Sequence, residues 1–208
     1  MGLANRPRIR HGEGDVAVLR VELSGVTLGI WRRLAISTRA SLLELHAVIQ
    51  GAFGLALADE HEFERDGVRY VDPDGADRPS HATDHTALSS LGIVPGSRFT
   101  HAATTLDEPW RHVVTVEQLT PRLVRQRVPL CLAAVGAPPP DDCDGPTRYC
   151  ELLAALDAPL DPRAAELREW LPDDFDPTYA NLNAINAQLA RLPKHRPGHL
   201  RVANQTAG

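Results

Sequence analysis

The side chains with the clearest chemical potential in this sequence are three histidines, an aspartate and a cysteine: His46, His61, His112, Asp142 and Cys143. Imidazole, carboxylate and thiolate groups are the ligands that zinc prefers, and catalytic zinc sites use three of them with water in the fourth position. No two of these residues have the short spacing of a local metal motif. A divalent-metal site therefore forms only if the fold brings distant segments together.

The alternative interpretation of the same residues is structural. His46 then lies at a helix–sheet boundary, His112 follows the alternation of a strand, and Cys143 is a small buried thiol. Clusters without a local motif are weak indicators of metal sites, so spacing favours this alternative. His81 and His85 are four residues apart, but they fall in a polar loop, and we expect them in solvent.

Cys143 lies in a segment rich in proline and acids, residues 138–146, and a helix pattern begins near Thr147. A helix N-terminus favours a thiolate, whereas neighbouring negative charge raises the pKa of a thiol. Because acids such as Asp142 and Asp144 surround Cys143, we expect an unreactive thiol and expect the acids to cap the helix. The sequence contains neither a Gly-x-Ser-x-Gly motif nor a P-loop, so it gives no support for hydrolase or nucleotide chemistry.

Two Trp-Arg pairs, Trp31-Arg32 and Trp110-Arg111, occur on strand patterns. Such aromatic–basic pairs can stack single-stranded bases. Strand alternation explains them more simply, with each tryptophan in the core and each arginine in water. We therefore expect both pairs to be structural.

Charge is distributed unevenly along the chain of 208 residues, whose net charge is −5. Residues 1–14 and 191–208 are basic, and the remainder is acidic. An acidic body argues against broad binding of phosphate backbones, which needs a concentrated cationic face, so nucleic acid is expected only at the basic tails. Without a secretory signal, a membrane-spanning run or paired cysteines, we expect a cytoplasmic protein that binds no membrane.

Hydrophobic periodicity predicts most elements. Strand-like alternation covers residues 16–23 and 30–36 and predicts a hairpin. Residues 41–54 predict a helix with a capping box between Ser41 and Glu44 and a terminal glycine. Asp66-Gly67 predicts a tight hairpin between residues 61–65 and 68–71, and further strand patterns cover 98–104 and 111–116. Helix patterns follow at 147–156, 161–171 and 181–192.

This order predicts an α+β fold: a β-grasp-like (ubiquitin-like) mixed sheet with one covering helix, plus a helical C-terminal half. The expected organisation is a flexible N-terminus (1–15), one domain (16–192) and a flexible basic tail (193–208). Within the domain we expect a sheet part (16–120), a hinge (121–146) and a helical part (147–192).

Several motifs together resemble those of the plasmid Ri (pRiA) open-reading-frame-three-like family, which includes TnpR-like passenger proteins of insertion sequences. The residues that carry the resemblance are Trp31, Arg32, His46, Trp110, Pro139, Pro140, Asp141 and Gly145, together with His61-Glu62-Phe63 and Asp174-Phe175-Asp176-Pro177. They occur in the family's order over roughly residues 16–192. The chain departs from the family pattern at Glu108, where an aspartate is usual.

The resemblance implies a mixed α+β fold and an association with plasmids or transposable elements through genetic context, but no established activity. Our leading hypothesis is a non-enzymatic binding or adaptor protein that contacts an unknown protein partner and needs no cofactor. The alternative is a metal-dependent enzyme that uses His61, His112 and Asp142 or Cys143. A third hypothesis is weak nucleic-acid binding through the basic tails.

Overall fold

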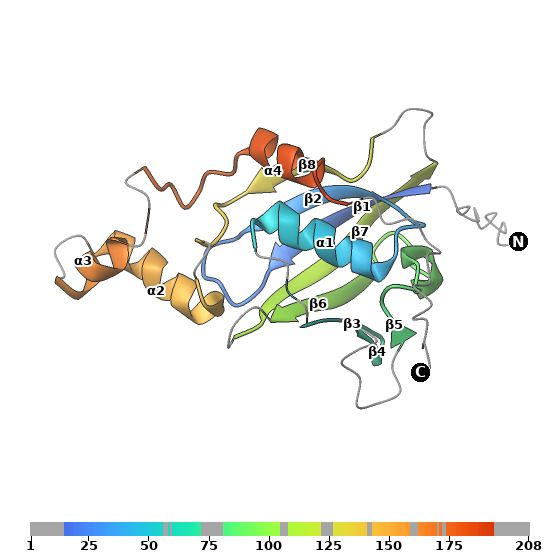
Figure 1. Ribbon diagram of the computed structural model, residues 1–208, viewed down its shortest axis with the longest axis horizontal. Coiled ribbons are helices and arrows are strands. Elements are labelled where there is room, and N and C mark those ends of the chain that lie inside the picture. Colours follow the sequence, from blue (N-terminus) through green and yellow to red (C-terminus); the bar gives the residue numbers. More distant parts are fainter. Residues whose placement is uncertain are drawn as a thin grey trace, which may run out of the picture.

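The computed structural model describes residues 15–55, 58, 60–71, 81–104, 108–121, 127–140, 143–158, 162–169, 171 and 174–193. Its central feature is one eight-stranded sheet with the order β5-β4-β3-β6-β7-β1-β2-β8 (Figure 1). The strands are β1 (Asp15–Leu23), β2 (Trp31–Ser37), β3 (Glu60–Arg65), β4 (Val68–Val71), β5 (His81–Ala82), β6 (Arg98–Thr104), β7 (Trp110–Pro121) and β8 (Leu130–Val135). Every neighbouring pair is antiparallel except the short pair of β4 and β5.

The expectation of a β-grasp fold is wrong. A β-grasp sheet pairs its first and last strands in parallel, whereas here β1 pairs with β7 in antiparallel register. Both predicted hairpins are confirmed: β1 pairs with β2, and β3 pairs with β4 across Asp66-Gly67. Alternation therefore predicted these strands and their local pairing. It contains no information about which distant strand becomes a neighbour.

The strand patterns at 98–104 and 111–116 are confirmed as β6 and part of β7. The expected helical C-terminal half is wrong, because the second half of the chain supplies two strands of the sheet, β7 and β8. The helices that follow are α2 (Gly145–Asp157) and the shorter α3 (Pro162–Arg168) and α4 (Leu182–Leu189). β8 occupies a stretch that we expected to be a hinge. β8 is a run of six mostly apolar residues bounded by Pro129 and Gly136. Such short bounded runs are typical of strands.

The helix α1 (Leu42–Phe53) lies against one face of the sheet (Figure 1). It begins with the predicted capping box, in which Glu44 N–H donates to Ser41 Oγ at 3.1 Å and Ser41 N–H donates to Glu44 Oε2 at 2.8 Å. It ends at Gly54, whose φ of 66° is the left-handed conformation that glycine adopts without strain. Its apolar stripe packs on the buried side of β1, β2, β6 and β7 to form the main core.

The opposite face of the central strands is less covered. Arg20 and Glu22 on β1, Arg33 on β2 and Glu117 on β7 are only partly buried, whereas the residues between them belong to the core. A short 3-10 helix, η2 (Leu88–Leu91), adds Leu88 and Leu91 to the core side. We call the polar side of β1, β2, β7 and β8 the open face.

The outer edge of β8 is closed by the C-terminal part of the chain. The side chain of Asn186 on α4 accepts a hydrogen bond from the backbone N–H of Cys131 at Oδ1 (2.8 Å) and donates one from Nδ2 to the carbonyl oxygen of Cys131 (3.0 Å). Gly136 and Ala137 donate backbone hydrogen bonds to Thr178 and Pro177. The contacts at Cys131 occupy backbone groups with which another strand would pair, and those beyond the end of β8 hold the C-terminal segment beside it, which limits extension of the sheet.

Candidate functional site

Four imidazoles meet between α1 and the sheet. His46 comes from α1, His61 from β3, His101 from β6 and His112 from β7, and all four are buried. His46 Nδ1 lies 2.9 Å from His101 Nε2, and His101 Nδ1 lies 3.2 Å from His112 Nδ1. His46 Nε2 lies 3.1 Å from the carbonyl oxygen of Ala58. These three contacts link the helix to two strands of the sheet.

His61 joins this cluster by stacking. Its ring lies 4.1 Å from that of His46, with only 12° between the planes. Its Nε2 lies 2.9 Å from the hydroxyl of Thr83, which is fully buried. Phe63 and Phe53 enclose the cluster, with ring centroids 4.7 Å from those of His101 and His112 respectively. The imidazoles therefore lie in an apolar setting.

Burial keeps the inner histidines neutral. The pKa of His112 is lowered to about 3, chiefly by desolvation, with the neighbouring His46 and Arg32 contributing. Desolvation likewise lowers the pKa of His101 well below the ordinary value, with His112, His46 and His61 adding to the effect. A buried imidazolium is unfavourable here because a charge loses its hydration in an apolar interior.

Two of the candidate metal ligands, His61 and His112, belong to this cluster, together with His46. Cys143 has its contacts elsewhere, at the start of α2, and Asp142 lies outside the described residues. Within the described part of the chain, no three histidine, cysteine or acidic side chains form a group that could hold a metal ion. The nitrogen atoms face one another in pairs and do not converge on one point.

The sequence interpretation missed His101. It alternates with Phe99 and Ala103 on β6, so strand periodicity places it on the core side of the sheet. A histidine that shares a face with apolar neighbours was the available signal. His81 begins the two-residue strand β5, and His85 is exposed as expected, with Nε2 lying 3.2 Å from Asp84 Oδ2.

The thiol of Cys143 is buried, and burial raises its pKa to about 11. Arg148 opposes this shift, whereas the carboxylates of Asp144 and Glu108 add to it. The expectation that the loop acids cap α2 is wrong for Asp144, which makes no side-chain capping bond. Asp141 and Asp142 lie outside the described residues.

The cap of α2 comes from Glu108, which lies just before β7. Its carboxylate accepts hydrogen bonds from the backbone N–H of Thr147 at 3.0 Å and from the hydroxyl of Thr147 at 3.1 Å. Gly145 has a φ of 77°, and a Cβ atom there would lie 2.5 Å from Glu108 Cβ. Glycine is therefore required at this family-motif position, because a side chain would displace the cap.

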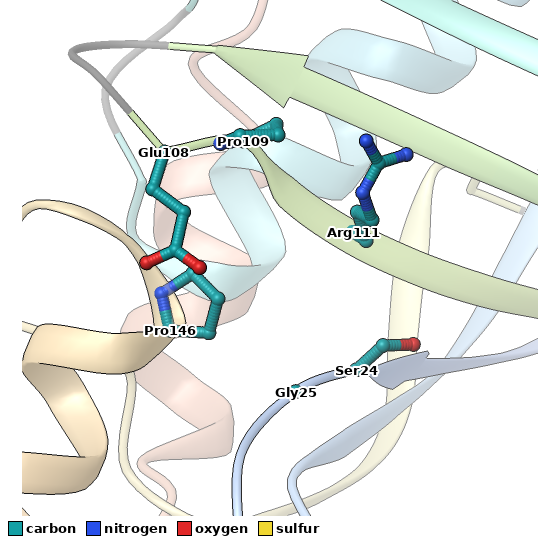
Figure 2. A pocket seen from close by; sticks show the side chains of 6 residues that line it. All are labelled: Ser24, Gly25, Glu108, Pro109, Arg111 and Pro146. Atoms are coloured by element: carbon teal, nitrogen blue, oxygen red, sulfur yellow. The ribbon is translucent and has the colours of Figure 1, made fainter.

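A shallow pocket of about 370 Å³ lies beside this cap and is lined by Ser24, Gly25, Glu108, Pro109, Arg111 and Pro146 (Figure 2). Glu108 is already engaged by Thr147, as the preceding distances show. The remaining wall combines Gly25 and two prolines with the side chains of Ser24 and Arg111. With Glu108 engaged, few polar groups remain to orient a ligand.

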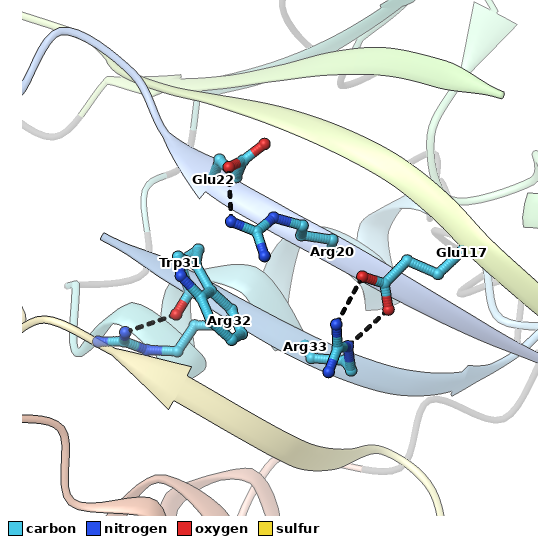
Figure 3. A network of polar contacts seen from close by, with 6 residues as sticks. All are labelled: Arg20, Glu22, Trp31, Arg32, Arg33 and Glu117. Carbon is cyan, nitrogen blue, oxygen red and sulfur yellow. Dashed lines mark hydrogen bonds and ion pairs between the residues drawn. The ribbon is translucent and has the colours of Figure 1, made fainter. Parts of the chain in front are cut away.

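Arg32 contradicts the expectation that each tryptophan faces the core and each arginine faces water. Arg32 is fully buried, whereas the tryptophan beside it is only partly buried. Its guanidinium donates to the carbonyls of Ala52 at 2.9 Å, Val135 at 2.8 Å and Gly136 at 3.0 Å. It also donates to the carbonyl of Trp31 at 2.9 Å (Figure 3).

These acceptors explain how a charged side chain is tolerated inside the core. Desolvation lowers the pKa of Arg32 to about 10, which leaves the group charged at neutral pH. Ala52 lies in the last turn of α1, where free carbonyls and the helix dipole favour a cation. Arg32 thereby connects the end of α1 to β2 and to the end of β8.

Trp31 lies on the open face between two guanidinium groups, those of Arg20 at 4.3 Å and Arg33 at 5.7 Å from its ring centroid. Arg33 makes a bidentate pair with Glu117, with distances of 2.6 and 2.9 Å, and Arg20 contacts Glu22 at 2.9 Å (Figure 3). The ring and the two cations form a fixed, partly exposed surface.

Beside Trp31, the strand β8 exposes three large aliphatic side chains. Leu130, Leu132 and Val135 are 36%, 44% and 40% exposed. Val135 is the direct cross-strand partner of Trp31, so the two share a side of the sheet. We call Leu130, Leu132 and Val135 the β8 strip.

Three of the remaining family-motif residues make packing or backbone contacts. Trp110 is 1% exposed and belongs to the core, as expected, and Pro139 is buried. The carbonyl of Pro140 accepts a hydrogen bond from the backbone of Cys143 at 3.0 Å, which closes the loop before α2.

Among the described helices, none has the length and apolar character that crossing a membrane requires.

The fold and these sites define a class of α+β proteins in which a single, largely antiparallel sheet is covered on one face and contains buried histidines. Residues 15–184 match the family model of plasmid pRiA4b ORF-3-like proteins, and the chain belongs to this family.

The relatives found have no described activity. The chain is 31% identical over 181 residues to the uncharacterized protein y4hQ of Sinorhizobium fredii (strain NBRC 101917 / NGR234). The matched region covers 86% of this chain and 92% of the relative. It is also similar to the crystal structure of MM3350, a protein of unknown function from Methanosarcina mazei Go1. That likeness has a TM-score of 0.72 and 27% identity, and it covers 81% of this chain and 96% of the other. The expected family is thus confirmed.

Proposed function

We propose that this protein is a non-enzymatic binding protein that recognises another protein through the open face of its sheet. The observation that supports this proposal is the β8 strip beside Trp31: three aliphatic side chains exposed together on one strand. Contiguous exposed apolar groups on a folded protein commonly mark an interaction site. Tryptophan and arginine, which flank the strip here, are the residues most enriched in interface hot spots.

The partner fitted to this surface is a segment with aliphatic side chains in its centre and carboxylates at its flanks. The aliphatic groups would cover Leu130, Leu132 and Val135. The carboxylates would reach Arg20 and Arg33, whose side chains are 31% and 39% exposed. The partner would bind by its side chains, because Asn186 and the segment around Thr178 already occupy backbone groups of the β8 end.

Leu132→Asp tests this proposal, with Val94→Asp as a matched control. Leu132 is 44% exposed within the strip, and Val94 is 57% exposed on the turn between η2 and β6. Burial of one aliphatic side chain contributes about 1.5–3 kcal/mol, so losing it should weaken partner retention by about tenfold or more. Affinity capture from host extract with quantitative mass spectrometry provides the measurement.

The expected result is a protein retained by the wild type and by Val94→Asp and depleted with Leu132→Asp. Equal retention by both variants, or retention of nothing, would overturn the proposal. Light scattering of the purified chain distinguishes a second copy of itself as occupant. Loss of the retained material after nuclease treatment would indicate nucleic acid, which is the partner expected for the basic tails.

A metal-dependent enzyme is the second candidate; the four buried imidazoles contact one another, but they form no group of three metal ligands within the described residues. It requires His61 and His112 to share a metal with Asp142 or Cys143. Elemental analysis of protein purified without chelator is its test. Stoichiometric zinc, manganese or iron would support this candidate, and metal at trace level would reject it.

A further inference from the structure

The β8 strip has a definite length and one irregularity. Leu130 pairs with Ala35 and Val135 pairs with Trp31, so both ends of the strip project from the open face. The register shifts between Arg33 and Leu34, which leaves Leu132 as an extra residue without a partner on β2. Because four strand steps separate Trp31 from Ala35, the two ends of the strip lie about 13 Å apart.

The edge of β8 offers few backbone groups to an added strand. The side chain of Asn186 occupies both the N–H and the carbonyl of Cys131. The carbonyl of Val135 accepts a hydrogen bond from Arg32 at 2.8 Å, and the N–H of Gly136 donates to the carbonyl of Thr178 at 3.3 Å. A partner strand would have to displace these contacts before it could extend the sheet.

A segment that covers the strip must also satisfy its own backbone. An extended chain that lies on the side chains without pairing to β8 would bury N–H and C=O groups that have no partner, and this is unfavourable. A helix forms its backbone hydrogen bonds internally and can bury one apolar face. The length of the strip, about 13 Å, equals about eight or nine residues of helix, so side chains at i, i+4 and i+8 would match it.

Charge distinguishes the two flanks of the strip. Arg33 and Arg20 lie on the β2 and β1 side, beside Trp31, and are partly exposed. The other flank is formed by Asn186 and the segment around Thr178, which contribute amide and backbone groups at these contacts. A helix seated on the strip would therefore gain from carboxylates along one edge only, the edge above β2.

We propose that the segment recognised by the β8 strip is an amphipathic α-helix of another protein, which lies along β8 with its apolar side chains on Leu130, Leu132 and Val135 and its carboxylates toward Arg33 and Arg20. This inference rests on the proposed function and specifies the partner of the same site. It separates a helix from an added strand and from a second copy of this chain.

Photo-crosslinking in host cells locates the bound segment, with p-benzoylphenylalanine at position 130 in one preparation and at position 135 in another. Mass spectrometry then identifies the residues that are crosslinked. We expect both positions to reach one segment of another protein, at sites separated by about seven to nine residues. A separation of about four residues would indicate an extended chain and overturn the helix, although the protein partner would stand.

The remaining outcomes are also decisive. No protein crosslink from either position would overturn both the helix and the proposed function. Crosslinked peptides of this chain itself would identify a second copy and overturn the helix of another protein. If only one position gives a crosslink, the segment that it identifies is sufficient for the peptide experiment.

The crosslinked segment, prepared as a ¹³C-labelled peptide, tests the conformation on the full-length protein. Its bound Cα chemical shifts should be helical over about two turns or more, and extended shifts would overturn the proposal. A proline midway between the crosslinked residues should weaken binding by about tenfold or more relative to alanine at the same place, since proline breaks a helix interior. Equal affinities of these two peptides would contradict a helical partner.

The charged flank has its own pair of variants, Arg33→Gln and Arg69→Gln. Both arginines pair with a glutamate, Glu117 and Glu62 respectively, but Arg69 lies on β4, away from the strip. We expect Arg33→Gln to weaken peptide binding by about threefold at low salt and less at high salt, and Arg69→Gln to leave it unchanged. Equal affinity in both variants would show that the carboxylates of the helix do not face Arg33.

Discussion

The two Trp-Arg pairs have the same sequence and opposite environments. Trp110 is 1% exposed and Arg111 is exposed, as alternation with an apolar core suggests. In the other pair Arg32 is 0% exposed, and Trp31 lies on the open face between Arg20 and Arg33. Each pair begins a strand of the same sheet, β7 or β2.

Acceptors explain the difference. Arg32 projects toward the end of α1 and the end of β8, where four carbonyls accept its N–H groups. Arg111 projects to the other side, and no comparable set of carbonyls faces it among the described residues. Period-two alternation predicts that the side chains of adjacent strand residues point to opposite faces of the sheet. Which of the two side chains is buried depends on where distant carbonyl groups lie.

Arg32→Met should give the largest effect on the comparison. The substitution keeps the apolar stem and leaves several buried carbonyls without a donor, at a cost of about 5 kcal/mol in the free energy of unfolding. Arg111→Met, on the exposed member, should change it by less than about 0.5 kcal/mol. Urea denaturation followed by circular dichroism measures both. Similar values for the two variants would remove the distinction between the pairs.

For the tryptophans we expect the opposite order of stability losses: substitution of Trp110 should cost more than substitution of Trp31. Trp110→Ala empties a site in the core and should cost about 4 kcal/mol. Trp31→Ala should cost about 1 kcal/mol, because it removes cation–π contacts and a partly exposed ring. The same urea experiment applies. A larger loss for Trp31 would show that the open face contributes to the core.

Low pH distinguishes the two buried basic side chains, Arg32 and His112, by their protonation. Arg32, with a pKa lowered to about 10, stays charged throughout the acidic range, whereas His112, with a pKa lowered to about 3, stays neutral. Below pH 6.5 the unfolded chain binds protons at histidine that the folded chain excludes, so stability falls as the pH is lowered from 6.5 toward 3.

When the pH falls from 7.5 to 5.5, His112 lowers the free energy of unfolding by about 1 kcal/mol, and His101 lowers it by a similar amount. Urea midpoints at the two pH values should therefore move closer together in His112→Asn than in the wild type. Unchanged spacing would mean that His112 titrates normally in the folded protein.

Arg33→Gln should have the smallest effect on stability. The pair with Glu117 is partly exposed, and solvent screens such pairs. We expect no measurable change in the urea midpoint but weaker retention of the partner, since Arg33 flanks Trp31 on the open face. A lowered midpoint would assign Arg33 a structural role and weaken the argument for the open face.

Local chemistry was predictable from sequence. The capping box of Ser41 and Glu44, the glycine at the end of α1 and the Asp66-Gly67 hairpin all form as expected, because each depends on residues close in the chain. The buried histidine cluster was only partly predictable: His46, His61 and His112 were identified as candidates, and His101 was not.

The rest depends on contacts between distant segments. The pairing of β1 with β7 makes the sheet antiparallel and excludes a β-grasp, yet neither strand encodes its partner. β8 lies in a short apolar run whose outer edge is completed by Asn186, 55 residues further along the chain. Glu108 caps α2 through the backbone N–H of Thr147, 39 residues later in the chain, where the acids of the preceding loop had been expected to do so.

The central claim is that the open face binds a protein at the β8 strip. Site-specific photo-crosslinking tests it most directly, with p-benzoylphenylalanine placed at position 132 in one preparation and at position 94 in another, each used in host cells. We predict a protein crosslink of defined mass from position 132 and none of that mass from position 94. The same crosslink from both positions, or none from position 132, would contradict the claim.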